Sequence, residues 1–204
     1  MDKRSFLQQA GAASVAAGVL LASRSARAQA SSSELNILIA YHSVTGNTEK
    51  MAQGVADGAK SVSGTNVLVK RVGDVVTDDL LSSDAIIVGS PVYFGNVSGD
   101  VKTFFDNWLL TFGVFRDFKM RNKVGGAFVT GASISNGKET TMQAILAAML
   151  INQMSVVSGG GAFGASATTG PDSPGIDDKE LESARALGKR VAEVAAITKR
   201  GSRN

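Results

Sequence analysis

Short apolar runs alternate with amphipathic stretches along most of the chain. The apolar runs predict strands at residues 35–41, 66–72, 85–89, 123–130 and 154–158; a helical period predicts helices at residues 49–62, 99–110, 139–152 and 179–198, with a short polar helix at 78–83. A glycine-rich loop is expected at residues 159–178. This order predicts an α/β fold, a doubly wound five-stranded parallel sheet with helices on both faces. In such a fold, ligands bind beyond the carboxyl ends of the strands.

Residues 1–30 carry the features of an export signal. Residues 3–7 read Lys-Arg-Ser-Phe-Leu, similar to a twin-arginine signal in which lysine replaces one arginine. A mildly apolar stretch follows at residues 11–22, and Ala-Gln-Ala at residues 28–30 supplies a cleavage pattern. An N-terminal membrane anchor is the alternative, although the apolar stretch is shorter than the roughly 20 residues that a spanning helix needs. We therefore expect export, for example to the periplasm, and one domain at residues 31–204 without a stable membrane span.

Removing the predicted signal changes what the charge of the chain implies. The chain has 21 basic and 18 acidic residues, and removing Lys3, Arg4, Arg24, Arg27 and Asp2 leaves 17 of each. A domain without net charge offers no electrostatic reason to expect a nucleic-acid partner. The chain contains no cysteine and one histidine, which excludes disulfides, thiol catalysis and metal sites built from cysteine or several histidines. We therefore expect no resident metal.

The most informative motif lies between the first predicted strand and the helix that follows it. This polar turn consists of Ser43, Val44, Thr45, Gly46, Asn47 and Thr48. The first amides of a helix have no partner within the helix, and the helix dipole favours negative charge there. The turn is therefore a candidate phosphate site, in which amides and the hydroxyls of Ser43, Thr45 and Thr48 would hold the anion. An ordinary helix start, capped by Asn47 or Thr48, is the alternative.

Two further loops follow predicted strands at the same edge of the sheet. One contains Pro91, Val92, Tyr93, Phe94, Gly95 and Asn96, and the other contains Gly131, Ala132, Ser133 and Gly137. In the first, an aromatic ring would cover a heterocycle; the alternative is that its rings only pack on a neighbouring helix. In the second, small residues permit close approach of the backbone to a ligand. The single histidine, His42, is either a proton donor or a residue that lines the edge of the site.

These loops are similar to those of a known family. The motif at residues 43–48 resembles the phosphate loop of flavodoxins, S/T-x-T-G-N-T. Residues 90–106, SPVYFGNVSGDVKTFFD, resemble a segment of the tryptophan-repressor-binding-protein (WrbA) type of NAD(P)H:quinone oxidoreductase. The likeness runs from the first strand to the last helix. It implies a flavodoxin-like fold and flavin mononucleotide (FMN) as cofactor, with residues 91–96 at the isoalloxazine ring and Phe94 beside the substrate pocket.

The resemblance also implies an activity, a two-electron hydride transfer from NAD(P)H as co-substrate through FMN to a quinone-like acceptor. No catalytic side chain is expected, because the cofactor carries the chemistry. The resembled enzymes usually form tetramers, which implies a homo-oligomer (dimer or tetramer), with the aromatic passage at residues 108–118 as a candidate interface. One alternative is an exported flavodoxin-like electron carrier without its own small-molecule substrate, and another is a scaffold that has lost its flavin. The neutral domain favours the enzyme, whereas export favours the carrier.

Overall fold

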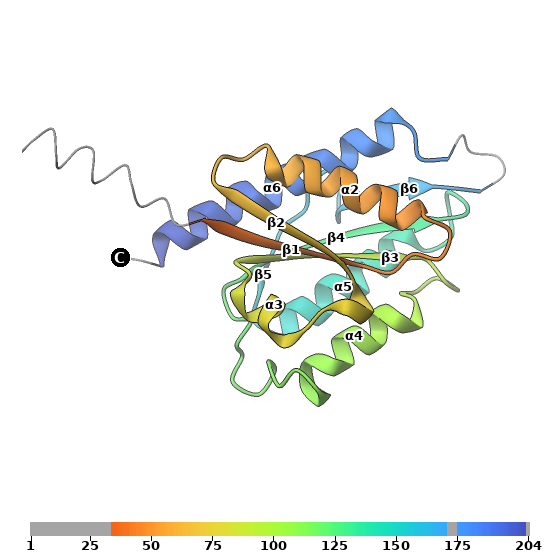
Figure 1. Ribbon diagram of the computed structural model, residues 1–204. Coiled ribbons are helices and arrows are strands. Elements are labelled where there is room, and N and C mark those ends of the chain that lie inside the picture. Colours follow the sequence, from red (N-terminus) through yellow and green to blue (C-terminus); the bar gives the residue numbers. More distant parts are fainter. Residues whose placement is uncertain (1–33, 171–174, 203–204) are drawn as a thin grey trace, which may run out of the picture. The chain divides into compact units, whose positions relative to one another are not determined.

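The computed structural model describes residues 34–170 and 175–202, so the predicted export signal at residues 1–30 lies outside the described residues. The described strands form one parallel sheet in the order β2-β1-β3-β4-β5, with β6 also paired to β4. They are β1 (Leu35–Tyr41), β2 (Thr65–Arg71), β3 (Ala85–Pro91), β4 (Val124–Gly131), β5 (Ser155–Val156) and β6 (Ala165–Thr168). Figure 1 shows this sheet between two layers of helices.

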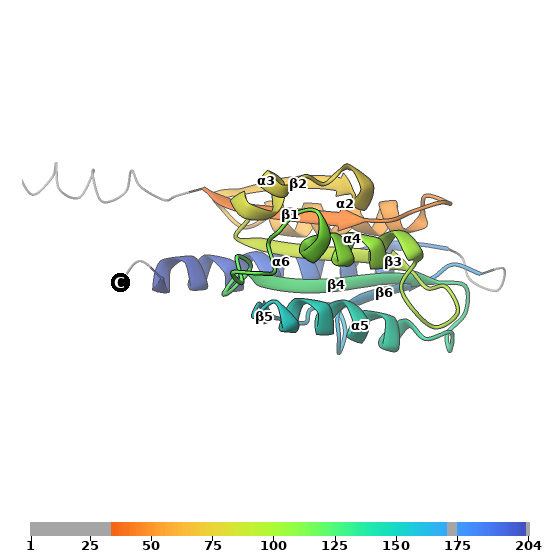
Figure 2. The ribbon, with the colours of Figure 1, turned by 90° about the horizontal axis from the view of Figure 1, so that it is seen from below.

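The two faces of the sheet are covered by different helices. The helices are α2 (Asn47–Lys60), α3 (Thr77–Ser82), α4 (Gly99–Leu110), α5 (Lys138–Ile151) and α6 (Asp178–Gly201), with a 3₁₀ turn η1 (Val72–Asp74). Side chains alternate along β1, so that Ile37 and Ile39 pack against α2 and α6, whereas Leu38 and Ala40 face the other side. Figure 2 shows α4 and α5 on that second side. This arrangement confirms the predicted doubly wound α/β fold.

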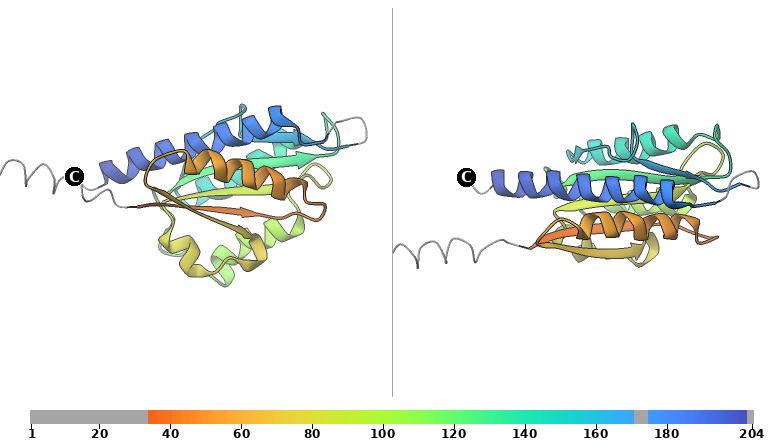
Figure 3. Two further views of the ribbon diagram at one scale, coloured as in Figure 1. Left: turned by 45° about the horizontal axis from the view of Figure 1, so that its top comes forward. Right: turned by 90° about the horizontal axis from the view of Figure 1, so that it is seen from above.

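Helices α2 and α6 pack backbone to backbone, side by side in the right-hand view of Figure 3. A Cβ atom on Gly58 would lie 1.9 Å from the carbonyl oxygen of Arg185, and one on Gly188 would lie 1.9 Å from that of Val55. Only glycine permits so close a crossing. Since α2 is held along its length, its first turn is placed firmly at the carboxyl edge of the sheet.

The fifth position of the sheet differs from the prediction. The strand expected at residues 154–158 has only two residues in strand conformation, and the loop expected at 159–178 contains a second strand, β6. Strand β5 pairs with the start of β4, and β6 pairs with its end, from Phe128 to Gly131. The sequence of β6, Ala-Ser-Ala-Thr, lacks the β-branched apolar run that marked the other strands. Two short strands therefore share the position predicted for one.

Other boundaries lie within a few residues of the prediction, and β1 and α4 coincide with it. Among the described residues, no helix combines the length and apolar character needed to cross a membrane.

Candidate functional site

The loop after β1 is an open turn at an uncapped helix. Gly46 stands at the N-cap of α2 with φ 84°, a left-handed conformation, and no side chain caps the helix. The alternative of a helix capped by Asn47 or Thr48 is therefore wrong. Residues 44–46 are exposed, so the first-turn amides of α2 lie beside an accessible surface. An uncapped, accessible helix start suits an anion, and this observation fits the phosphate of FMN.

The three hydroxyls of this loop have different surroundings. Ser43 is buried, and its Oγ accepts a hydrogen bond from the amide of Gly46 at 3.1 Å. Thr45 lies on the exposed part of the turn, where its Oγ1 accepts a hydrogen bond from the side-chain amide of Asn47 at 3.2 Å. Thr48 is turned inward, and its Oγ1 is 2.8 Å from that of Thr130. Thus only Thr45 presents its hydroxyl on the exposed surface of the turn.

Arg71, at the end of β2, contacts the turn at residues 43–48, which is called the phosphate loop from here on. Its guanidinium donates to the carbonyl oxygen of Ser43 at 2.8 Å and pairs with the carboxylate of Glu49 at 2.9 Å. It also lies over the ring of Tyr41, 5.7 Å from the centroid. Burial raises the pKa of the Tyr41 hydroxyl, and the neighbouring Glu49 carboxylate adds to the effect. Since Glu49 already neutralises Arg71, an anion in the turn would depend chiefly on backbone amides.

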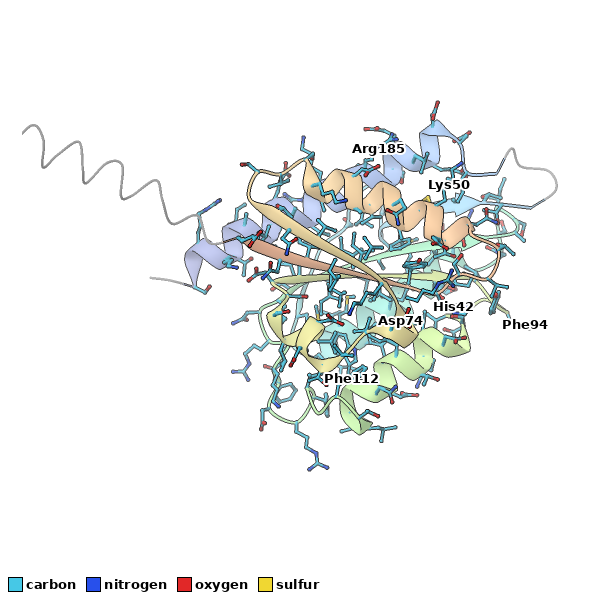
Figure 4. All side chains as sticks on the ribbon, in the orientation of Figure 1. His42, Lys50, Asp74, Phe94, Phe112 and Arg185 are labelled. Carbon is cyan, nitrogen blue, oxygen red and sulfur yellow. The ribbon has the colours of Figure 1, made fainter. Side chains whose placement is uncertain are left out.

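The loop after β3 ends in a tight hairpin. The amide of Tyr93 donates to the carbonyl of Asn96 at 2.9 Å, and the reverse bond is 3.1 Å. Phe94 and Gly95 have φ values of 51° and 77°, as in a two-residue turn of the primed class. Left-handed backbone is uncommon for phenylalanine, and such strain gathers at functional sites. Phe94 is fully exposed, and Figure 4 shows it at the outer end of its loop.

The loop after β4 folds against this hairpin. A Cβ atom on Gly137, whose φ is 91°, would lie 2.7 Å from the Cα of Gly95. The hydroxyl of Thr140 donates to the carbonyl oxygen of Gly95 at 3.0 Å. Ala132 and Ser133 are exposed on the same loop. The amides and small side chains of this loop therefore stand directly beside the hairpin that carries Phe94.

His42 is held toward α4. Its amide donates to the carbonyl of Gly89 at 3.1 Å, and its Nδ1 lies 3.6 Å from a carboxylate oxygen of Asp100 in α4. Its side chain is mostly buried. This contact directs the imidazole to the start of α4, at the edge of the predicted site.

The structure brings the three predicted loops together at the carboxyl ends of β1, β3 and β4. Sequence reasoning missed Thr130, the last residue but one of β4, which contacts two of these loops. Its Oγ1 meets Thr48, and its carbonyl oxygen accepts the amide of Val92 at 2.8 Å. A hydroxyl at the end of a fully buried strand was the available signal. The individual assignments of flavin contacts to residues in these loops stay predictions.

Comparisons with known proteins match this architecture. The family model described as NADPH-dependent FMN reductase matches residues 74–169. A protein named NAD(P)H dehydrogenase (quinone) from Chromohalobacter salexigens is 32% identical over 197 residues, covering 78% of this chain and 96% of the relative. One of the same name from Archaeoglobus fulgidus is 33% identical over 193 residues, with coverage of 78% and 96%.

Among solved structures, the crystal structure of a flavodoxin, WrbA-like protein from Agrobacterium tumefaciens has a TM-score of 0.67 and 30% sequence identity. The match covers 79% of this chain and 97% of that one. The chain is thus a member of the flavodoxin-like, WrbA-type family of NAD(P)H dehydrogenases (quinone).

Proposed function

We propose that this chain is an FMN-dependent oxidoreductase that takes a hydride from NAD(P)H and reduces a quinone-like acceptor by two electrons. The observation that carries this proposal is the convergence of three loops: an uncapped helix start, a strained hairpin with an exposed aromatic ring, and a glycine-containing loop packed against it. The names of the relatives support the choice of NAD(P)H as donor and a quinone as acceptor.

The residues of the site suit the parts of FMN. The amides at the start of α2 and the hydroxyl of Thr45 would hold the phosphate without a basic side chain. The hairpin that carries Phe94 and the loop at residues 131–137 would hold the ring, since both expose backbone at the same edge of the sheet. FMN, when bound, would supply two-electron chemistry, because its ring can take up a hydride and pass both electrons on to an acceptor.

The side chains of this chain therefore bind and orient rather than react. The hairpin places Phe94 at the outer end of its loop, where its fully exposed ring would offer a flat face to an aromatic acceptor. Because the hairpin is held by two mutual backbone hydrogen bonds and by Thr140, the backbone that carries this ring is in place before the acceptor arrives. Fixed geometry of this kind lowers the entropic cost of bringing two reactants together.

One experiment separates the enzyme from an electron carrier. The purified protein is reconstituted with FMN, desalted, and mixed with NADH or NADPH without oxygen. We expect rapid loss of the visible flavin absorbance, followed by turnover when benzoquinone is added. A protein that retains FMN but is bleached by neither nucleotide would be a flavodoxin-like carrier. A protein that stays colourless after desalting would refute the flavin site itself.

We also propose that the chain forms a homo-oligomer through the outer faces of α4 and α5. A groove of about 730 Å³ lies between these helices, lined by Phe105, Leu109 and the three alanines of α5. Leu110 and Ile151 beside it are 75% and 64% exposed. Exposed apolar surface of this kind is typical of protein interfaces. Light scattering after gel filtration tests the proposal: wild type should run as a dimer or tetramer and Ile151→Glu as a smaller species, and a monomeric wild type would refute it.

For residues 1–30 we propose export by a twin-arginine-like route. The pattern of the sequence supports this, and that route would carry the domain folded, with FMN already bound. Cell fractionation of the full chain and of a Lys3→Gln, Arg4→Gln variant tests it. We expect the wild-type protein in the exported fraction and the variant inside the cell; equal distribution of the two would contradict the proposal.

A further inference from the structure

One buried hydrogen bond joins the phosphate loop to the strand behind the other two loops. Thr48 and Thr130, 82 positions apart in the chain, place their hydroxyl oxygens 2.8 Å apart. The two residues are only 2% and 4% exposed. Thr130 follows Phe128 by two positions in β4, so its side chain points to the same face of the sheet, the face that α2 covers. The bond therefore ties the first turn of α2 to β4 across the end of β3.

The backbone of Thr130 extends this connection to the ring loops. Its carbonyl oxygen accepts the amide of Val92 at 2.8 Å, where the hairpin loop leaves β3. Its neighbour Gly131, which opens the third loop, accepts the amide of Thr169 at 2.8 Å. Thus Thr130 holds the phosphate loop through its side chain and the hairpin loop through its backbone.

We propose that Thr130 is a positioning residue that acts through Thr48 to set the first-turn amides of α2 for the phosphate of FMN. This inference rests on the proposed function, because it concerns how that same site holds its cofactor. It assigns the Thr48 hydroxyl an internal role: this hydroxyl anchors the first turn of α2 to β4 and does not bind the phosphate directly. The inward orientation and burial of Thr48 carry this distinction, whereas Thr45 has its hydroxyl on the exposed turn.

Loss of the hydrogen bond between Thr48 and Thr130 should weaken the binding of FMN. In Thr130→Val the methyl groups keep the shape of the side chain, but the hydroxyl of Thr48 is left buried without its partner. A buried polar group in that state is costly, so the turn moves to bring Thr48 to water and the amides leave their binding arrangement. Only those molecules whose turn keeps its binding arrangement can bind FMN, so the apparent affinity for FMN falls in proportion to their fraction. We expect about a tenfold loss. Riboflavin, which lacks the phosphate, should bind as before.

A double-mutant cycle on the full-length protein tests the proposal. Dissociation constants for FMN and riboflavin are measured by quenching of flavin fluorescence in wild type, Thr48→Val, Thr130→Val and the double variant. We expect each single substitution to weaken FMN about tenfold, and the double variant to be no weaker than either single one, because the second change removes a group that has already lost its partner. Thr130→Ser keeps the hydroxyl and should restore the affinity for FMN.

Thr65→Val is the matched control. The Oγ1 of Thr65 is buried and has no hydrogen-bond partner among the described residues, and it lies at the start of β2, away from the loops. The same chemical change there removes no hydrogen bond, so affinity for FMN should match that of wild type.

Several outcomes would overturn the proposal. If Thr48→Val weakens FMN while Thr130→Val does not, Thr48 contacts the phosphate directly. If FMN and riboflavin lose affinity equally, Thr130 has only a general structural role. Should Thr130→Val not fold, Thr130→Ala lacks the same hydroxyl and makes the same prediction. If the wild-type protein binds FMN and the variants bind it equally well, only the positioning role of Thr130 is refuted. If the wild-type protein does not bind FMN, the proposed function itself is refuted.

Discussion

The crossing of α2 and α6 allows a sharp prediction about stability. In Gly58→Ala, the new Cβ would stand 1.9 Å from the carbonyl oxygen of Arg185 and 2.6 Å from its carbonyl carbon, whereas real Cβ contacts under 3.0 Å are essentially never seen. The atoms it meets belong to backbone, so no side-chain rotation relieves the clash. The two helices would have to separate by about 1 Å, and overpacking of this kind costs about 1–3 kcal/mol.

Helix propensity acts in the opposite direction and provides the control. Replacing glycine by alanine inside a helix stabilises it by roughly 1 kcal/mol when nothing is in the way. At Gly54, one turn earlier in α2, the nearest atoms are the Cβ of Ala184 at 3.0 Å and a methyl group of Leu181 at 3.3 Å, and the latter side chain can move. We therefore expect Gly54→Ala to change the free energy of unfolding by less than about 1 kcal/mol.

Urea denaturation and thermal melting, both followed by circular dichroism, measure the stability of both variants. For Gly58→Ala we expect a loss of about 2 kcal/mol and a fall in the melting temperature of about 4–8 °C, given the shift typical of a domain this size. A Gly58→Ala protein as stable as wild type, or more stable, would mean that helix propensity decides at this position. The backbone contact between α2 and α6 would then be looser than the structure has it.

Three further predictions concern the site and its surroundings. Gly46→Ala should weaken FMN binding 5- to 30-fold, because a left-handed alanine costs roughly 1–2 kcal/mol; Gly64→Ala has a similar φ, far from the loops, and should bind FMN as wild type does, measured by fluorescence quenching. Phe94→Ala removes a ring that packs on nothing, so the melting temperature should hold while KM for benzoquinone rises several-fold; an unchanged KM would contradict its role. Burial alone would raise the pKa of Asp79, but hydrogen bonds from Lys70 and a backbone amide outweigh it and lower that pKa. The ionised Asp79 carboxylate therefore stabilises the fold above pH 3.8, the ordinary pKa, and this contribution is lost as the pH falls through the lowered pKa. When the free energy of unfolding is measured against pH, Asp79→Asn should make it fall less steeply at acid pH.

The sequence predicted those elements whose pattern is local. Strand β1 is a buried apolar run that ends in a polar turn, and α4 begins at Gly99 after Ser98, whose hydroxyl caps it. Strand β6 escaped prediction because its inward residues, Ala165 and Ala167, are small, and its place in the sheet depends on pairing with β4 rather than on its own propensity. Local pattern identifies an element only where the element carries its own apolar signal.

The site was predictable to the same extent. Each loop was found from its composition and from its position after a strand, and Gly95 has the left-handed backbone that glycine adopts readily. That Phe94 shares this conformation follows from the two-residue turn, which requires positive φ at both central positions. The meeting of Thr48 and Thr130 was beyond prediction from pattern, because nothing in the sequence says which of several buried hydroxyls across the strands will come within 2.8 Å.

The contacts between the loops bear on how the site works as a unit. Thr130 ties the phosphate loop to β4 and the hairpin loop to β4, and Thr140 with Gly137 ties the third loop to the hairpin. A ligand bound at the start of α2 therefore meets a group of three loops, the hairpin among them, that these contacts already join. Because the hydrogen bonds between these loops are made within the chain, the ligand does not have to order them when it binds, which lowers the entropic cost of binding. In the proposed site, the phosphate and the ring of FMN would therefore be held by loops whose separation is set by these internal contacts.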